Sequence, residues 1–187
     1  MNLSGKKIAI LATNGFEQSE LEVPRDRLKQ AGATVHVVSP EKGEIRGWDK
    51  KDWGRPVPVD RPLDDVKVDD YDALVLPGGQ INPDLLRVNA NAIELIRAFF
   101  DKKKIVAAIC HAPWLLIEAG VIKGRKVTSY HSIKTDVINA GGKWENAAVV
   151  NDQGLITSRN PDDLEDFSKK IMEEVIEGPH TKRHAAA

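Results

Sequence analysis

The single cysteine of the sequence, Cys110, lies where an apolar run gives way to a helical pattern, and His111 follows it directly. Residues 105–109 are continuously apolar, as expected for a strand buried on both faces of a parallel sheet. Pro113 suits the first turn of a helix, so Cys110 is predicted at a strand-to-helix corner, a nucleophile elbow. Amides at the start of a helix favour an anion, so we expect a reactive thiolate with a lowered pKa.

A cysteine hydrolase needs a thiolate, a proton shuttle and donors for the developing oxyanion. Here Cys110 would be the nucleophile, His111 the acid or base, and the backbone amides near Gly79 and His111 the donors. Adjacency in sequence does not by itself pair the two side chains. The alternative is that Cys110 is a small buried hydrophobic residue, the commonest fate of a lone cysteine, but its position beside His111 favours catalysis.

A glycine pair follows the strand predicted at residues 71–76. Gly78 and Gly79 would lie at the same carboxyl edge of the sheet as the elbow, where glycines let backbone amides approach a ligand closely. The loop is therefore predicted to form the second wall of an oxyanion hole. It lacks the length, the lysine and the hydroxyl residue of a nucleotide P-loop, which argues against ATP binding.

Glu17 lies at another strand-to-helix junction, between a predicted strand at residues 6–13 and the helix that follows. Ligands bind at this edge of α/β sheets, so Glu17 could approach the elbow from a neighbouring strand. The alternative is an acidic residue that complements the helix dipole. Glu20, one turn later, is interpreted as a charge at the helix start.

Three ordered motifs, AICHAP at residues 108–113, LPGG at 76–79 and DVINAG at 136–141, resemble those of the PfpI family of intracellular cysteine proteases. That family includes bacterial general stress proteins. It belongs to the superfamily of the parkinsonism-associated deglycase, which is of the class I glutamine amidotransferase-like type. The resemblance extends from residue 6 to residue 177, nearly the whole chain.

The resemblance also implies roles for two acidic residues. Glu17, in the segment Gly15-Phe16-Glu17, matches the glutamate that hydrogen-bonds the catalytic thiol in the family. Asp84 matches the acid that orients the histidine from an adjacent subunit, which implies a homodimer or a larger homo-oligomer. Asp84 is one methylene shorter than the glutamate of some relatives, and it could instead cap a short helix.

Three further positions are compared with the family pattern. Ala112 stands where many members have glycine, so its methyl group is expected to narrow the site or alter the elbow. Trp114 and His131 vary within the pattern and are expected to line the pocket.

Length and composition favour one domain without a nucleic acid partner. The chain has 187 residues, of which 41% are hydrophobic, and no internal break in composition divides it. A net charge of −1 with interspersed signs argues against nucleic acid or an anionic membrane as the main partner. With one cysteine and no visible signal peptide or long apolar segment, the protein is expected to be cytoplasmic.

The order of predicted elements indicates a single-domain three-layer α/β/α sandwich with a mostly parallel, flavodoxin-like sheet. Residues 1–178 would form this domain and residues 179–187 a mobile tail. Residues 40–62 are predicted to make a hairpin excursion, in which Trp48 and Trp53 cover a core edge or a subunit contact. Residues 34–39, 126–130 and 155–158 are predicted to form further strands. Ser132 is predicted to cap the helix that runs to Ala140.

Two classes of function fit these features. The first is a cysteine-dependent hydrolase, either a peptidase or amidase of the PfpI type or a glyoxalase or protein deglycase acting on methylglyoxal adducts. Its substrate would be a peptide or a small carbonyl compound, and no cofactor or metal is predicted. The second is a stress protein that senses oxidants through Cys110 or acts like a chaperone.

Overall fold

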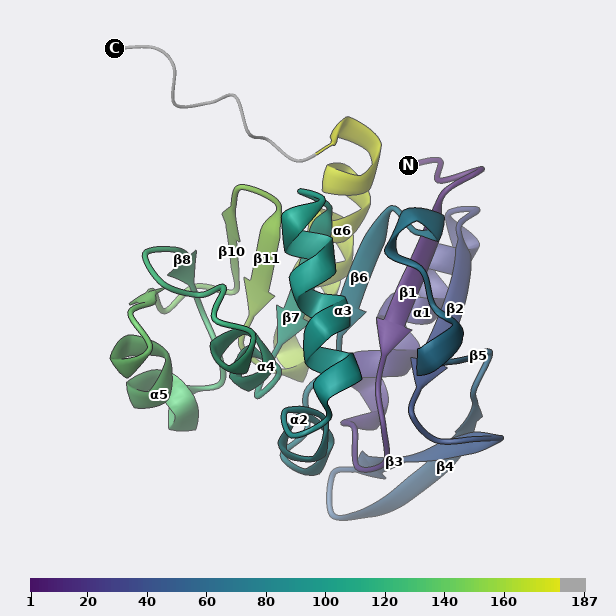
Figure 1. The fold of residues 1–187 in the computed structure, drawn as a ribbon, viewed down its shortest axis with the longest axis horizontal. Coiled ribbons are helices and arrows are strands. Elements are labelled where there is room, and N and C mark those ends of the chain that lie inside the picture. The colour runs from purple at the N-terminus through teal and green to yellow at the C-terminus, as the bar shows by residue number, and fades with distance from the viewer. Residues whose placement is uncertain (179–187) are drawn as a thin grey trace.

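A seven-stranded sheet forms the centre of the computed structural model, which describes residues 1–178 (Figure 1). Its strand order is β10-β11-β7-β6-β1-β2-β5, and every neighbouring pair is parallel except β10 and β11. The predicted single-domain α/β fold is confirmed. The strands are β1 (Lys7–Leu11), β2 (Thr34–Ser39), β5 (Arg61–Pro62), β6 (Ala73–Leu76), β7 (Ile105–Ile109), β10 (Val149–Asp152) and β11 (Leu155–Ser158).

Helices cover both faces of this sheet. Helices α1 (Gln18–Gln30) and α6 (Leu164–Glu177) pack on one face, and α3 (Ala90–Asp101) and α4 (Pro113–Glu118) pack on the other (Figure 1). The remaining helices are α2 (Ile81–Leu86), α5 (Lys134–Asn139) and the 3-10 turns η1 (Leu63–Asp65), η2 (Val68–Asp70), η3 (His131–Ile133) and η4 (Pro161–Asp163).

Strand β7 shows why a continuous apolar run predicted the centre of the sheet. Successive side chains of a strand point to opposite faces. Ile105 and Ile109 pack into the core under α1 and α6, whereas Val106 packs into the core under α3 and α4. All five residues of β7 are buried, so the apolar run extends to the residue before Cys110.

The predicted hairpin excursion is present as β3 (Glu44–Asp49) paired antiparallel with β4 (Asp52–Pro58). Its backbone is tied to the loop after β1, because the Trp48 amide donates to Phe16 O at 2.6 Å and the Gly15 amide donates to Arg46 O at 2.8 Å. These bonds hold Trp48 at the carboxyl edge of β1.

Several predicted elements differ from the structure. The strand expected at 126–130 is only β8 (Lys126–Val127), which pairs with β9 (Lys143–Trp144) in a separate small sheet. Ser132 does not cap α5, since that helix begins at Lys134 with Ile133 as its cap residue and no side-chain cap. The predicted tail at residues 179–187 lies outside the described residues. Within residues 1–178, no helix is long and apolar enough to cross a membrane.

Candidate active site

Cys110 forms the predicted elbow between β7 and α4. Its φ is 65°, in the left-handed region that side chains other than glycine rarely adopt. Two hydrogen bonds hold this backbone: the Cys110 amide donates to Ser158 O at 3.0 Å, and its carbonyl accepts from the Tyr130 amide at 2.8 Å. The strained corner is therefore fixed by β11 on one side and by the segment after β8 on the other.

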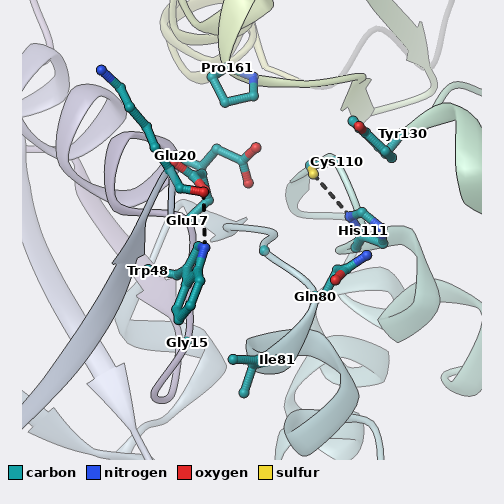
Figure 2. A pocket seen from close by; sticks show the side chains of 12 residues that line it. Gly15, Glu17, Glu20, Trp48, Gln80, Ile81, Cys110, His111, Tyr130 and Pro161 are labelled. Carbon is teal, nitrogen blue, oxygen red and sulfur yellow. Dashed lines mark hydrogen bonds between the residues drawn. The ribbon is translucent and has the colours of Figure 1, made fainter. Parts of the chain in front are cut away.

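A cavity of about 560 Å³ opens beside the thiol at the carboxyl edge of the sheet. Figure 2 shows Cys110, His111 and Tyr130 on one side of it and Glu17 and Trp48 on the other. Its lining comes from the loop after β1, α1, the hairpin, the loop after β6, the elbow and the segments after β8 and β11. The lining residues are Gly15, Glu17, Glu20, Trp48, Lys50, Gly79, Gln80, Ile81, Cys110, His111, Tyr130 and Pro161.

His111 contacts the thiol directly. Its position next to Cys110 in the sequence did not establish that the two side chains are paired. The distance between Cys110 Sγ and His111 Nδ1 is 3.1 Å. The imidazole stacks on Tyr130 with the ring centroids 4.8 Å apart, and Trp114 approaches it edge-on at 5.2 Å. Burial, together with the nearby His131, lowers the pKa of His111 to about 4. The ring is therefore neutral near pH 7 and a weaker base than a free imidazole.

Glu20, and not Glu17, is the carboxyl group at the thiol. Glu20 is completely buried, and its Oε2 accepts from the Gly78 amide at 2.8 Å. Burial raises the pKa of Glu20 to about 8, and its carboxyl interacts with the Cys110 side chain. The interpretation of Glu20 as a charge at the helix start is thus wrong. Helix α1 turns this side chain inward, beneath the elbow.

Glu17 occupies a different position in the same cavity. It precedes α1 in an extended conformation, is half-buried, and lines the cavity wall. Burial and the neighbouring charge of Asp49 raise the pKa of Glu17. The predicted hydrogen bond from Glu17 to the thiol is not found, because Glu20 fills the space beside the sulfur.

The thiol environment contradicts the predicted lowering of the Cys110 pKa. Burial raises the pKa of Cys110, and the negative charge of ionised Glu20 raises it further, while the backbone amides of Gly79 and His111 act in the opposite direction. These two amides are the predicted oxyanion donors, and the structure places both at the sulfur. Below pH 8 Glu20 holds its own proton, so no carboxylate charge then opposes the thiolate.

The glycine loop after β6 is packed too tightly for a larger residue. A Cβ atom on Gly78 would lie 2.6 Å from Glu20 Oε2 and 2.7 Å from Cys110 Cβ. Gly79 has a φ of 76°, and a Cβ there would lie 2.5 Å from Gly15 O. Both glycines are therefore needed for the close approach of this loop to the elbow, as their sequence predicted.

Asp84 does not reach His111 within one chain. It lies on α2, is exposed, and forms an ion pair with Arg87. The Arg87 guanidinium lies over the ring of Trp114, 4.8 Å from its centroid. The action of Asp84 on the histidine of a neighbouring subunit stays a prediction.

Three other predicted positions surround the site without lining the cavity. The methyl group of Ala112 is completely buried and packs into the core under α3 and α4. It therefore does not narrow the site. Trp114 donates from Nε1 to Asp136 at 2.8 Å and packs against His111, while His131 packs against Tyr130 at 4.4 Å. Trp114 thus supports the ring of His111, and His131 supports the ring of Tyr130.

Sequence reasoning missed Glu20, Tyr130 and Ser132, and it assigned Trp48 to a core edge or subunit contact. One signal for Glu20 was available: it shares a helical face with Leu21, Pro24 and Leu28, all of which are buried. Nothing local marks Tyr130 or Ser132, since the irregular segment after β8 brings them to His111.

A family model described as "DJ-1/PfpI family" matches residues 6–174. The chain is 46% identical over 166 residues to "Deglycase PfpI" of Pyrococcus furiosus, covering 89% of this chain and 97% of the relative. It is 43% identical over 170 residues to "General stress protein 18" of Bacillus subtilis, covering 90% and 96%.

Solved structures share the architecture. The crystal structure of Drosophila melanogaster DJ-1beta is similar with a TM-score of 0.83 and 32% identity, over 94% of this chain and 91% of that one. The family model, the sequence relatives and this structure all match nearly the whole chain. The chain therefore belongs to the DJ-1/PfpI family.

Proposed function

We propose that the chain is a cysteine-dependent hydrolase that attacks the carbonyl carbon of small adducts, in the manner of a deglycase. The observation that carries this proposal is the 3.1 Å contact between Cys110 Sγ and His111 Nδ1, with the amides of Gly79 and His111 directed at the sulfur. The groups that would act as nucleophile, base and oxyanion donors thus line one cavity, which supports the proposal.

The contacts support a two-step reaction. As His111 Nδ1 takes the thiol proton, the sulfur forms a bond to the carbonyl carbon, and the carbonyl electron pair moves to oxygen between the two amides. When the bond between this carbon and the nitrogen of the adduct breaks, the electron pair on oxygen re-forms the carbonyl group as a thioester, and the imidazole returns the proton to the leaving amine. Water then cleaves the bond between sulfur and carbon and restores the thiol. Below pH 8 Glu20 is neutral, so no carboxylate charge lies beside the thiolate.

The size of the cavity favours a compact substrate. Its volume of about 560 Å³ is in the range of ordinary small-molecule sites, and Trp48 and Pro161 bound it. The name of the relative from Pyrococcus furiosus, a deglycase, agrees with this substrate class. A peptidase or amidase is the second candidate, because the same thiolate and amides would serve the attack on a peptide carbonyl.

The experiment is a substrate screen with purified protein. Peptide amides, methylglyoxal and glycated amino acids are incubated with wild type, Cys110→Ser and the exposed control Glu118→Gln. We expect turnover of the carbonyl compounds, a loss of about 100-fold or more in Cys110→Ser, and no change in the control. Turnover of peptides alone would select the second candidate. Stoichiometric oxidation of Cys110 without turnover of any substrate would contradict both.

A further inference from the structure

Ser132 contacts the side of the histidine that points away from the thiol. Its Oγ lies 3.2 Å from His111 Nε2, while His111 Nδ1 lies 3.1 Å from Cys110 Sγ. His111 is 4% exposed, whereas Ser132 is an exposed residue of η3. The imidazole thus joins the buried sulfur on one side to a hydroxyl at the protein surface on the other.

We propose that Ser132 is a positioning residue that bonds to His111 Nε2 in both tautomers and carries the proton of Cys110 toward solvent. The inference rests on the proposed use of Cys110 as a nucleophile. A serine hydroxyl can donate and accept, so it can satisfy Nε2 in either neutral tautomer. An alanine at position 132 could neither donate to Nε2 nor accept from it, whereas a threonine could do both.

The proton transfer balances through these three groups. The S–H bond of Cys110 breaks as a proton joins Nδ1, the Nε2–H bond breaks as its proton joins Ser132 Oγ, and the hydroxyl releases its own proton to water. The imidazole ends neutral, with Nδ1–H donating to the thiolate. Burial disfavours a doubly protonated, charged ring. When a proton joins Nδ1, the proton on Nε2 must therefore leave, and Ser132 accepts it.

The ring cannot readily turn to another partner. Tyr130 stacks on one face of it with the planes 25° apart, and Trp114 packs against it at 62°. The titratable groups that face the imidazole are Cys110, Tyr130 and His131. Because packing fixes the ring, loss of the hydroxyl would change its protonation without moving it.

The test compares Ser132→Ala, Ser132→Thr and the matched control Thr135→Ala, an exposed hydroxyl on α5. The first readout is the rate of Cys110 alkylation by iodoacetamide between pH 6 and 9, which needs no substrate; the sequence has one cysteine, so the label is unambiguous. We expect a loss of about tenfold in Ser132→Ala, recovery in Ser132→Thr and no change in Thr135→Ala.

The second readout is the ¹⁵N chemical shifts of His111, which report its tautomer. They should change in Ser132→Ala and return in Ser132→Thr. Unchanged alkylation and unchanged shifts in Ser132→Ala would overturn the proposal. If these readouts change while wild type turns over no substrate, the role of Ser132 stands and the hydrolase function fails.

Discussion

The buried carboxyl group of Glu20 lies beside the thiol of Cys110, with the glycine loop after β6 closing over both. Ionised Glu20 raises the pKa of Cys110. The hydrogen bond with the Cys110 thiol lowers the pKa of Glu20, but by less than burial raises it. The two groups therefore titrate as a coupled pair. The reactive form is the thiolate beside a neutral carboxyl group.

The first prediction concerns stability against pH. Glu20 has a pKa of about 8 in the folded protein and 4.5 ordinarily, so the folded state keeps a proton that the unfolded chain loses. The contribution of Glu20 to the free energy of unfolding should fall as pH rises from 4.5 to 8, with a limiting slope of about 1.4 kcal/mol per pH unit. Glu20→Gln should remove this slope in urea denaturation, and Glu118→Gln should not.

His111 gives a slope of the opposite sign. Its pKa is about 4 in the folded protein and 6.5 ordinarily, so the unfolded chain binds a proton that the folded state excludes. In Glu20→Gln, stability should therefore fall as pH decreases from 6.5 to 4. In wild type the contributions of Glu20 and His111 oppose each other between pH 4.5 and 6.5, so stability should change little there and fall only above pH 6.5 and below pH 4.5. A Glu20→Gln curve that still declines between pH 6.5 and 8 would contradict the assignment to Glu20.

The second prediction separates Glu20 from Glu17 at the thiol. Glu20→Gln removes the charge that raises the pKa of Cys110 and keeps a neutral donor, so the midpoint of iodoacetamide labelling should move to lower pH. Because Glu20 is neutral below pH 8, the faster labelling should appear above pH 8, by about tenfold for each pH unit by which the midpoint falls. Glu17→Gln should move the midpoint less. An equal or larger change in Glu17→Gln would return the role to that residue.

The third prediction tests the wall formed by the hairpin. Trp48 lines the cavity, and Trp53 contacts it edge-on at 5.7 Å without lining the cavity. Trp48→Ala should raise KM by about 3- to 10-fold with little change in kcat, because the variant loses one aromatic contact with the bound substrate. Trp53→Ala is the matched control and should raise KM less. A fall in kcat alone would place Trp48 in the chemistry.

The fourth prediction concerns Ala112, where the family resemblance suggested an effect on the site. Because its methyl group packs into the core, Ala112→Gly should leave kcat and KM unchanged. It should lower the free energy of unfolding by about 1 to 2 kcal/mol through the lost methyl group and added backbone freedom. A changed KM at unchanged stability would show that the methyl group does reach the substrate.

The fifth prediction is that Asp84 acts on the His111 of a partner subunit. Asp84→Asn should then lower kcat strongly with little change in thermal stability, since Asp84 is exposed. Light scattering should show an oligomer. When Asp84→Ala and Cys110→Ala subunits are mixed and reassembled, some interfaces pair intact groups, and activity should reappear. No recovery after subunit exchange verified by mass spectrometry would reject action in trans.

The sequence predicted elements well where burial on both faces of the sheet dictates the residue types. The predicted bounds of β2, β7 and β11 coincide with the observed ones. The strand expected up to Tyr130 ends at Val127 instead, since the Tyr130 amide bonds to Cys110 O and its ring packs on His111. Such contacts join distant segments and leave no local pattern.

The site was predictable where topology alone determines position. Cys110 and Gly79 follow neighbouring parallel strands, so their backbones meet at one edge of the sheet. The choice between Glu17 and Glu20 depends on where α1 begins and how deeply it packs, which the resemblance did not resolve. Ser132 reaches the site from a 3-10 turn, whereas the sequence suggested a helix cap.

The backbone conformation of Cys110 also carries a cost in the free energy of folding. A φ of 65° is one that glycine adopts freely and that disfavours other residues by about 1 to 3 kcal/mol. The elbow therefore stores strain at the residue that carries the thiol. The hydrogen bonds that join the Cys110 backbone to Ser158 and Tyr130 hold that strain in the folded state.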